Sequence, residues 1–394
     1  MVTFSFEQAR ECVLESVPRR SGPAVTVPLE SACGRVLAAA ITADRDFPAL
    51  ARAVRDGYAV RATDTPGRLR VVAEVRAGEI LERAHDPGEA VEIMTGAPVP
   101  TGADAVVMVE HVEREGASIT APKAEPGQYI NPQGSEARAG DVLIEDGARI
   151  GAAEVALLAA VGRVQVPVHP QPRVAILTTG DEIVDAGATP AAYQIRNSNA
   201  HSLEAQVRRA GGIPVVLPVA GDTLEVTRAL LGQGLKADLL LISGGVSAGR
   251  YDVAKPALAS LGAEFYFDGV LIRPGRPTVF GRATGTFFFG LPGNPVSTLV
   301  TFELFARAAL ERLGGVPDPP LPLTLAHLTT SFRHKPGLTR FLPARLSADG
   351  ATVTPVPWKG SSDLAALVRA NSFLVAEEDR ESWAAGDLIR VMIR

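Results

Sequence analysis

Residues 287–297 read Phe-Phe-Phe-Gly-Leu-Pro-Gly-Asn-Pro-Val-Ser and give the clearest structural signal in the chain. An apolar strand ends at about Leu291, a Pro-Gly turn follows, and the pattern predicts a helix with Asn294 as N-cap and Pro295 as first residue. The backbone N–H groups and the dipole at such a helix start attract an anion. A well-capped strand–helix turn that binds nothing would show the same pattern.

Two upstream segments have the same form. Residues 173–179 form an apolar run that leads into Gly180-Asp181-Glu182, and residues 238–243 form another that leads into a glycine-rich loop at 244–249. Continuous apolar runs are typical of strands that are buried on both faces of a parallel sheet. With the helical pattern at 199–210, they predict a doubly wound α/β domain whose three loops open into one crevice.

The composition is that of a globular protein, with 46% hydrophobic and 21% charged residues and a net charge of −5 over 394 residues. This length exceeds one hydrophobic core, so we expect at least two domains. The negative charge argues against nucleic-acid binding, and no apolar run approaches the roughly 20 residues that span a bilayer. We expect a cytoplasmic protein with Cys12 and Cys33 as reduced core residues.

Six ordered blocks cover nearly the whole chain: Asp-Gly-Tyr-Ala at 56–59, Met-Thr-Gly-Ala-Pro-Val-Pro at 94–100, Thr-Gly-Asp-Glu at 179–182, Ser-Gly-Gly-Val-Ser at 243–247, Arg-Pro-Gly-Arg-Pro at 273–277 and Leu-Pro-Gly-Asn-Pro-Val-Ser at 291–297. In these blocks the chain resembles the molybdopterin molybdenumtransferases of molybdenum-cofactor biosynthesis, which include a domain of gephyrin. The resemblance implies a Mg²⁺-assisted homodimeric enzyme that inserts molybdate into the dithiolene of adenylated molybdopterin and releases AMP.

Alternatives remain open at this stage. A molybdopterin adenylyltransferase-like enzyme would use the same α/β domain, although it needs neither the long N-terminal half nor the tail. A non-catalytic molybdopterin-binding scaffold is the third reading. The resemblance also implies an upstream molybdopterin adenylyltransferase as partner, and the sequence does not separate molybdate from tungstate as the physiological ion.

The domain organisation combines pattern and resemblance. We expect a small β domain at 47–133, the α/β domain at 171–313, and a C-terminal β-barrel at 314–394. The resemblance implies that 1–46 and 134–170 form a split N-terminal domain. In it, a helix at 152–161 would pack on the helix that Ser5 and Gln8 open as a capping box.

The resemblance implies that Arg273 and Arg276 bind molybdate, although the family usually has lysine at both positions. A planar guanidinium group suits an oxyanion because it can donate two parallel hydrogen bonds. Ser297 and Ser361 match family positions near that oxyanion. By default, arginines in an isolated loop of this kind are solvated, and Ser361 or Ser362 would simply cap the next helix.

Three acids, Glu182, Asp222 and Asp252, match catalytic positions of the family. Magnesium prefers one or two carboxylates together with substrate phosphates, so Asp222 and Asp252 are its expected ligands. Taken singly, each acid is more often a turn or N-cap residue, and Asp181 could be a cap beside Glu182. The substrate-binding residues expected around these acids are Gly244, Gly245, Ser247, Pro292 and Pro295.

The resemblance also implies that Asp56, Thr95 and Glu136 reach the α/β site of a partner subunit, although Asp56 and Thr95 read as ordinary turn residues. Glu136 stands where the family has aspartate. In the tail, Pro343 replaces a family arginine, and either Arg340 or Arg345 could take its place.

Overall fold

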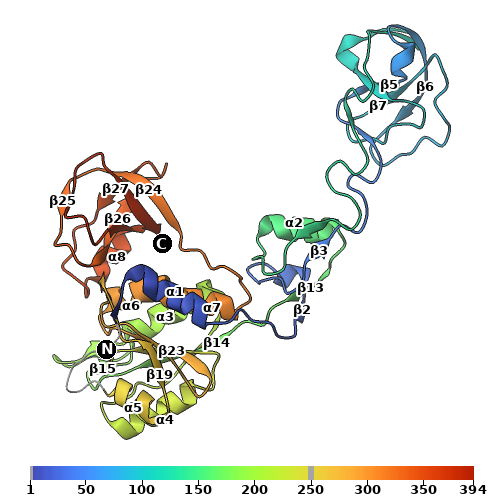
Figure 1. Ribbon diagram of the computed structural model, residues 1–394. Coiled ribbons are helices and arrows are strands. Elements are labelled where there is room, and N and C mark those ends of the chain that lie inside the picture. Colours follow the sequence, from blue (N-terminus) through green and yellow to red (C-terminus); the bar gives the residue numbers. More distant parts are fainter. Residues whose placement is uncertain (1–2, 247–252) are drawn as a thin grey trace.

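The computed structural model describes residues 3–246 and 253–394 (Figure 1). The molecule is elongated and bent. An α/β unit and a C-terminal barrel pack together at one end, and a small β unit lies at the other (Figure 1). Two short antiparallel strands, β4 (Arg52–Ala53) and β11 (Ile130–Asn131), form part of the narrow neck that leads to the small β unit.

The α/β unit is built on a six-stranded sheet. Its strands, in spatial order, are β17 (Ile213–Val216), β14 (Arg173–Thr178), β18 (Leu239–Ser243), β23 (Thr286–Leu291), β22 (Val279–Ala283) and β19 (Glu264–Phe267). The first four strands are parallel, whereas β22 runs opposite to them and pairs antiparallel with both β23 and β19. The carboxyl ends of β14, β18 and β23 therefore meet at one edge, as the sequence predicts.

Helices cover both faces of this sheet (Figure 1). Val174 packs with α3 (Ser198–Arg209) and α6 (Pro295–Thr301) on one face. Ala175 packs with α4 (Leu224–Gly234) and α5 (Ala254–Ser260) on the other face. Successive strand residues point to opposite faces, so burial on both sides explains the continuous apolar runs.

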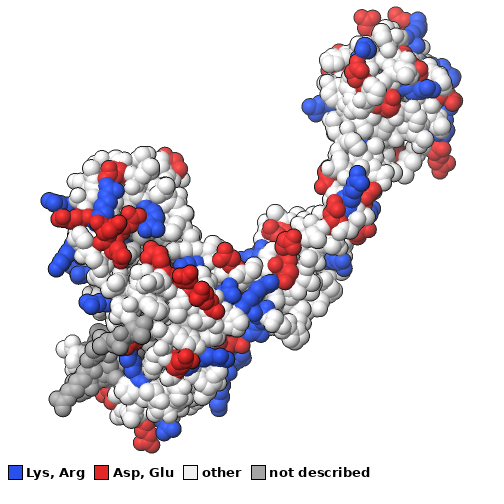
Figure 2. Space-filling model, in the orientation of Figure 1, with Lys and Arg blue, Asp and Glu red and all other residues white. Residues whose placement is uncertain are grey.

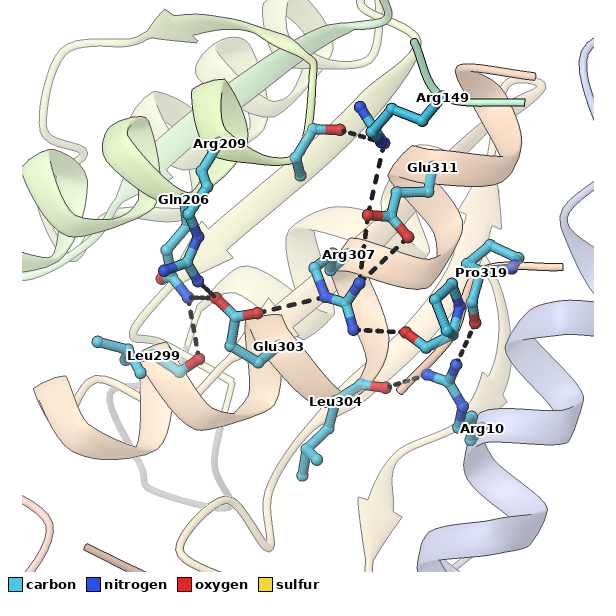
Figure 3. A network of polar contacts seen from close by, with 12 residues as sticks. Arg10, Arg149, Gln206, Arg209, Leu299, Glu303, Leu304, Arg307, Glu311 and Pro319 are labelled. Carbon is cyan, nitrogen blue, oxygen red and sulfur yellow. Dashed lines mark hydrogen bonds and ion pairs between the residues drawn. The ribbon is translucent and has the colours of Figure 1, made fainter. Parts of the chain in front are cut away.

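Helix α6 continues through a π-helical turn, Phe302–Ala306, into α7 (Arg307–Leu313). Glu303 in this turn is buried and accepts a hydrogen bond of 2.8 Å from Gln206 Nε2 of α3 (Figure 3). Its carboxylate also pairs with Arg209 and Arg307. The network therefore connects α6 and α7 to α3. Loss of one partner would leave a buried charge without compensation, which is strongly destabilising.

The expected contact between the two N-terminal helices is wrong. Helix α1 (Phe6–Ser16) has the predicted capping box, but its apolar face joins the core of the α/β unit and barrel. The Phe6 ring lies 6.0 Å from that of Phe305 and 5.3 Å from that of Phe341. Helix α2 (Ala152–Ala160) instead packs in a separate core with Leu37 and Val166.

That separate core belongs to a middle unit. Around α2 it contains two antiparallel strand pairs: β2 (Val25–Pro28) with β13 (Gln165–Val168), and β3 (Ile41–Thr42) with β12 (Val142–Ile144). Beyond the neck, the small β unit has a six-stranded sheet whose spatial order is β8 (Ala105–Met108), β5 (Gly57–Val60), β7 (Glu89–Ile93), β6 (Gly67–Val75), β10 (Ser118–Ala121) and β9 (Glu113–Glu115).

The C-terminal unit is a closed five-stranded barrel, as expected. Its strands are β26 (Thr339–Leu346), β27 (Thr352–Pro355), β24 (Leu323–Leu328), β30 (Leu388–Ile393) and β28 (Ser372–Ala376), and β28 pairs back with β26. Strand β21 (Ile272–Arg273) joins β26 and so connects the barrel to the α/β unit. Helix α8 (Leu364–Arg369) is capped by Asp363, so the alternative of a serine cap is wrong.

Short elements complete the description: strands β1 (Thr3–Phe4), β15 (Ile183–Val184), β16 (Ile195–Arg196), β20 (Gly269–Val270), β25 (Phe332–Arg333) and β29 (Ser382–Trp383), with 3-10 turns at Leu29–Ser31, Ala62–Asp64 and Val109–His111. On the visible face, acidic and basic side chains are interspersed (Figure 2). No helix within the described residues is long and apolar enough to cross a membrane. Cys12 is partly buried, but Cys33 is exposed, so its expected core position is wrong.

Candidate functional site

The three strand-end loops line one crevice of about 420 Å³. Thr179 and Gly180 follow β14, Gly244 and Gly245 follow β18, and Pro292-Gly293-Asn294 follows β23. Because parallel strands end together, the sheet brings segments more than 100 residues apart into one cavity. The predicted shared crevice is confirmed.

The glycine turn after β18 needs its glycines. Gly244 and Gly245 have φ values of 92° and 65°, and a Cβ on Gly245 would lie 2.7 Å from Thr179 Oγ1. Larger residues would fill the space in which the backbone approaches Thr179. The Thr179 hydroxyl is itself buried and has no hydrogen-bond partner within the described parts of the chain.

Glu182 and Asp222 both line this crevice. The Asp222 N–H donates to Asp181 Oδ1 at 3.0 Å, so Asp181 holds the loop that carries Asp222. The Glu182 carboxylate lies over Gly180, where a Cβ would meet its Oε2 at 2.7 Å. Two carboxylates beside a glycine-lined cavity are a donor set that suits Mg²⁺ when phosphates supply further oxygens. The expected ligand Asp252 and the expected phosphate contact Ser247 lie outside the described residues.

A second cavity of about 320 Å³ adjoins the first. Arg273, Arg276, Ser297 and Ser361 all line it, so the structure brings together the four residues that the resemblance assigned to the oxyanion. We call it the arginine pocket. It shares Pro277, Pro292 and Asn294 with the strand-end crevice, and the two cavities therefore form one continuous site.

Gly275 builds the loop that carries the two arginines. Its φ is +115°, and a Cβ there would lie 2.4 Å from Thr301 Cγ2 of α6. The loop is also held by Thr278 Oγ1, which donates to the Gly275 carbonyl. This close packing against α6 leaves the side chains of Arg273 and Arg276 exposed along the pocket.

The start of helix α6 differs from the expectation in one detail. Asn294 occupies the N-cap position of α6, but its side chain makes no capping hydrogen bond. Asn294 lines both cavities instead. The Val296 N–H, one of the helix-start donors, is satisfied by the Ser361 carbonyl at 3.0 Å. Ser361 thus ties α6 to the barrel unit through its backbone.

The three residues of the small β unit and neck are not brought to this site within one chain. Asp56 Oδ1 accepts hydrogen bonds from Thr95 N at 2.6 Å and Thr95 Oγ1 at 2.8 Å, and these bonds hold the pKa of Asp56 below its usual value. Glu136 Oε1 accepts a hydrogen bond from Asn131 Nδ2 at 3.0 Å. Asp56 and Thr95 adjoin β5 and β7, at the far end of the molecule from β14 and β23 (Figure 1).

Sequence reasoning missed two residues of the site. Trp358 lines the arginine pocket, and Asn199 of α3 lines the strand-end crevice. A single tryptophan outside any recognised motif gives no local sequence signal that it lines a binding site. Asn199 lies at the start of the predicted helix 199–210, where a polar residue reads as a helix cap.

The structure also separates Arg340 from Arg345. Arg340 of β26 pairs in register with Arg273 of β21, whereas Arg345 pairs in register with Thr354 of β27. Burial, and then the neighbouring Arg273 charge, lower the pKa of Arg340. Arg340 is therefore the arginine that stands beside the pocket.

Three family models match the chain in succession. The MoeA N-terminal region (domain I and II) matches residues 4–162, a probable molybdopterin binding domain matches 175–312, and the MoeA C-terminal region (domain IV) matches 326–393. Together they cover the unit around the crevice and both flanking regions. The second match contains the strand-end loops of the crevice.

Among curated proteins, the chain is 38% identical to molybdopterin molybdenumtransferase 2 of Mycobacterium tuberculosis, with 98% of each chain covered. It is 35% identical to the molybdopterin molybdenumtransferase of Bacillus subtilis, with 95% of this chain and 91% of the relative covered. Among solved structures, it is similar to a molybdopterin biosynthesis moeA protein of Pyrococcus horikoshii, with a TM-score of 0.84, 29% identity and full coverage of both chains.

Proposed function

This chain belongs to the molybdopterin molybdenumtransferase family, and on that basis we propose that it is a transferase that inserts molybdenum into molybdopterin. In the reaction that we propose, molybdate and adenylated molybdopterin are the substrates, and AMP and molybdenum cofactor are the products. An upstream molybdopterin adenylyltransferase would supply the adenylated substrate.

The observation that carries this proposal is the junction of two cavities with different chemistry. The strand-end crevice offers the glycine turn at Gly244 and Gly245, where backbone approaches closely enough to bind phosphates. The arginine pocket offers Arg273 and Arg276 for an oxyanion. A substrate that spans both cavities would carry its phosphates in one and its metal-accepting sulfurs beside the other.

Arg340 supports the oxyanion assignment. No ion pair joins Arg273, Arg276 or Arg340 to an acid within the described residues, and Arg340 Nε is buried without a hydrogen-bond partner there. Neighbouring cations without a protein counter-ion repel each other and favour a bound anion. Molybdate, a dianion, would relieve that repulsion.

Asp222, which lines the crevice, and Asp252 would hold magnesium there, and Glu182, which lines the same crevice, would be a further catalytic acid. A magnesium ion there would neutralise the charge of the substrate phosphates. Asp181 serves this arrangement indirectly, because its carboxylate accepts the hydrogen bond from the Asp222 N–H and fixes that loop.

We also propose that the active form is a homodimer in the cytoplasm. Asp56, Thr95 and Glu136 can contribute to catalysis only if a second copy brings its small β unit to the crevice, because one chain holds Asp56 and Thr95 far from it (Figure 1). A two-fold dimer would then contain two equivalent composite sites.

The test is a single-turnover reaction with adenylated molybdopterin and Mg²⁺, with and without molybdate, and with tungstate in parallel. We expect molybdate to accelerate AMP release and molybdenum to be recovered in the pterin product. In a parallel reaction that contains molybdopterin and ATP, formation of adenylated molybdopterin with release of pyrophosphate would instead indicate an adenylyltransferase. Binding of the substrate without turnover would indicate a scaffold.

A further inference from the structure

Asn199 joins two of the three loops that frame the crevice. Its side chain, only 8% exposed, lies in the first turn of α3. The Nδ2 group donates to Ser243 Oγ at 2.8 Å, at the end of β18, and to the Gly293 carbonyl at 2.7 Å, in the turn after β23. These two contacts cross from one loop to the other.

The chemistry of the partners fixes the orientation of the amide. The Gly293 carbonyl can only accept a hydrogen bond, so the group that faces it at 2.7 Å must be the NH₂ end of Asn199. The Oδ1 end then points elsewhere. This Oδ1 atom is buried and has no hydrogen-bond partner within the described residues, and Asn199 itself lines the crevice.

The two loops that Asn199 joins approach each other closely. A Cβ on Gly293 would lie 3.6 Å from the Cα of Gly244. No hydrogen bond between the described side chains other than those of Asn199 joins Ser243 to Gly293. The Gly244 N–H also donates to the Leu291 carbonyl at 3.1 Å, where β18 and β23 end, so the backbone aligns the starts of the two turns and the Asn199 amide holds Gly293 beyond that point.

We infer that Asn199 is a positioning residue that sets the spacing of the phosphate-binding turn and the Pro-Gly-Asn turn. It acts through Ser243 and Gly293 rather than by chemistry of its own. The inference rests on the proposed function for the identity of the ligand, but the loop spacing itself can be measured without any ligand.

The variant that tests this is Asn199→Asp, which keeps the shape of the side chain and removes both N–H donors. An ionised carboxylate would face the Gly293 carbonyl and repel it, whereas a protonated one could donate to it. The matched control is Asn371→Asp, the same substitution at an amide whose Nδ2 donates to the Leu346 carbonyl at 2.9 Å in the barrel, outside the crevice. Ser243→Ala, which removes one acceptor, is the milder second variant.

Hydrogen exchange of the backbone is the first measurement. In Asn199→Asp at pH 8, we expect residues 243–246 and 292–294 to exchange at least about tenfold faster than in the wild type, and Ser243→Ala to show a smaller increase. Asn371→Asp should leave both loops at the wild-type rate. Unchanged exchange of these loops in a folded Asn199→Asp protein would overturn the inference.

Calorimetric binding of AMP with Mg²⁺ is the second measurement. We expect Asn199→Asp to bind AMP roughly 10- to 100-fold more weakly than the wild type at pH 8. This ratio should shrink as the pH falls to 5.5, because the protonated carboxyl restores a donor; a purely structural defect would not recover. A ratio near one at pH 8 would contradict the inference. If the wild type binds no AMP but the loops respond in exchange, the positioning role stands and the nucleotide assignment fails.

Discussion

At the scale of single residues, the site is marked by arginines that have no acidic partner within the described residues. Arg273 and Arg276 line the arginine pocket, and Arg340 stands beside Arg273 on the neighbouring strand. Arg307, by contrast, is largely buried and pairs with Glu303 and Glu311 (Figure 3). The contrast distinguishes arginines that hold the fold from arginines that are available to a ligand.

Arg276→Ala and Arg340→Ala should each weaken the use of molybdate while the protein stays folded. A charge-assisted hydrogen bond contributes about 1.5–3 kcal/mol, which corresponds to roughly a 10- to 100-fold rise in the molybdate concentration for half-maximal rate. Arg345→Ala is the matched control, because Arg345 lies on the same strand but pairs in register with Thr354 of β27. An equal effect of Arg340→Ala and Arg345→Ala on molybdate dependence would reject the assignment.

At the scale of elements, the loop that carries Arg273 and Arg276 packs directly against helix α6, because Gly275 has no side chain to keep them apart. Gly275 has a positive φ and packs against Thr301 of α6, so the loop and helix touch through backbone and a methyl group. Gly360, which lines the same pocket, has nearly the same φ, +118°, but has open space where its Cβ would be. A substitution at Gly360 therefore reports the cost of backbone strain alone, whereas one at Gly275 reports the costs of strain and of overpacking together.

Gly275→Ala should therefore destabilise the protein more than Gly360→Ala does. Both substitutions place a Cβ at a positive φ, but only the first forces a methyl group into Thr301 Cγ2, and overpacking of this kind typically costs about 1–3 kcal/mol. The difference between the two variants in urea denaturation gives that cost. Equal destabilisation would mean that α6 yields without strain.

The same elements show what the sequence could reveal. Both-face burial left a continuous apolar signal in β14, β18 and β23, so the sheet and its shared crevice were predictable. The packing of α1 was not, because an amphipathic helix shows which face is buried but not what covers it. Asn199 was hidden for a similar reason: its partners, Ser243 and Gly293, lie 44 and 94 residues away.

At the scale of the whole molecule, the function that we propose depends on two distant ends. The crevice lies in the α/β unit, and Asp56 and Thr95 lie in the small β unit beyond the neck (Figure 1). We propose the domain division 1–46 with 134–170, 47–133, 171–313 and 314–394, with the exception that α1 packs on α7 and Phe341.

At a molybdate concentration too low to support Arg276→Ala, this variant and Asp56→Ala should complement each other in a mixed dimer. Asp56→Ala removes a residue of the small β unit and Arg276→Ala removes one of the arginine pocket, so a heterodimer would contain one site with both residues intact. We expect co-expressed, separately tagged subunits to recover part of the wild-type rate of molybdenum insertion, up to about half. Purified heterodimers without any recovered activity would show that the two residues do not act in trans.

The neck has a mechanical consequence. Phe47 N donates to the Ala137 carbonyl at 2.8 Å, and Glu136 N donates to the Phe47 carbonyl at 2.9 Å, so the outgoing and returning chains are fastened together at its base. The small β unit beyond the neck therefore pivots about this pair of hydrogen bonds. A small rotation at the base of the neck moves the loops of Asp56 and Thr95 over a much larger distance. The stiffness of these backbone hydrogen bonds thus determines how precisely those loops can be positioned against the crevice of a second copy.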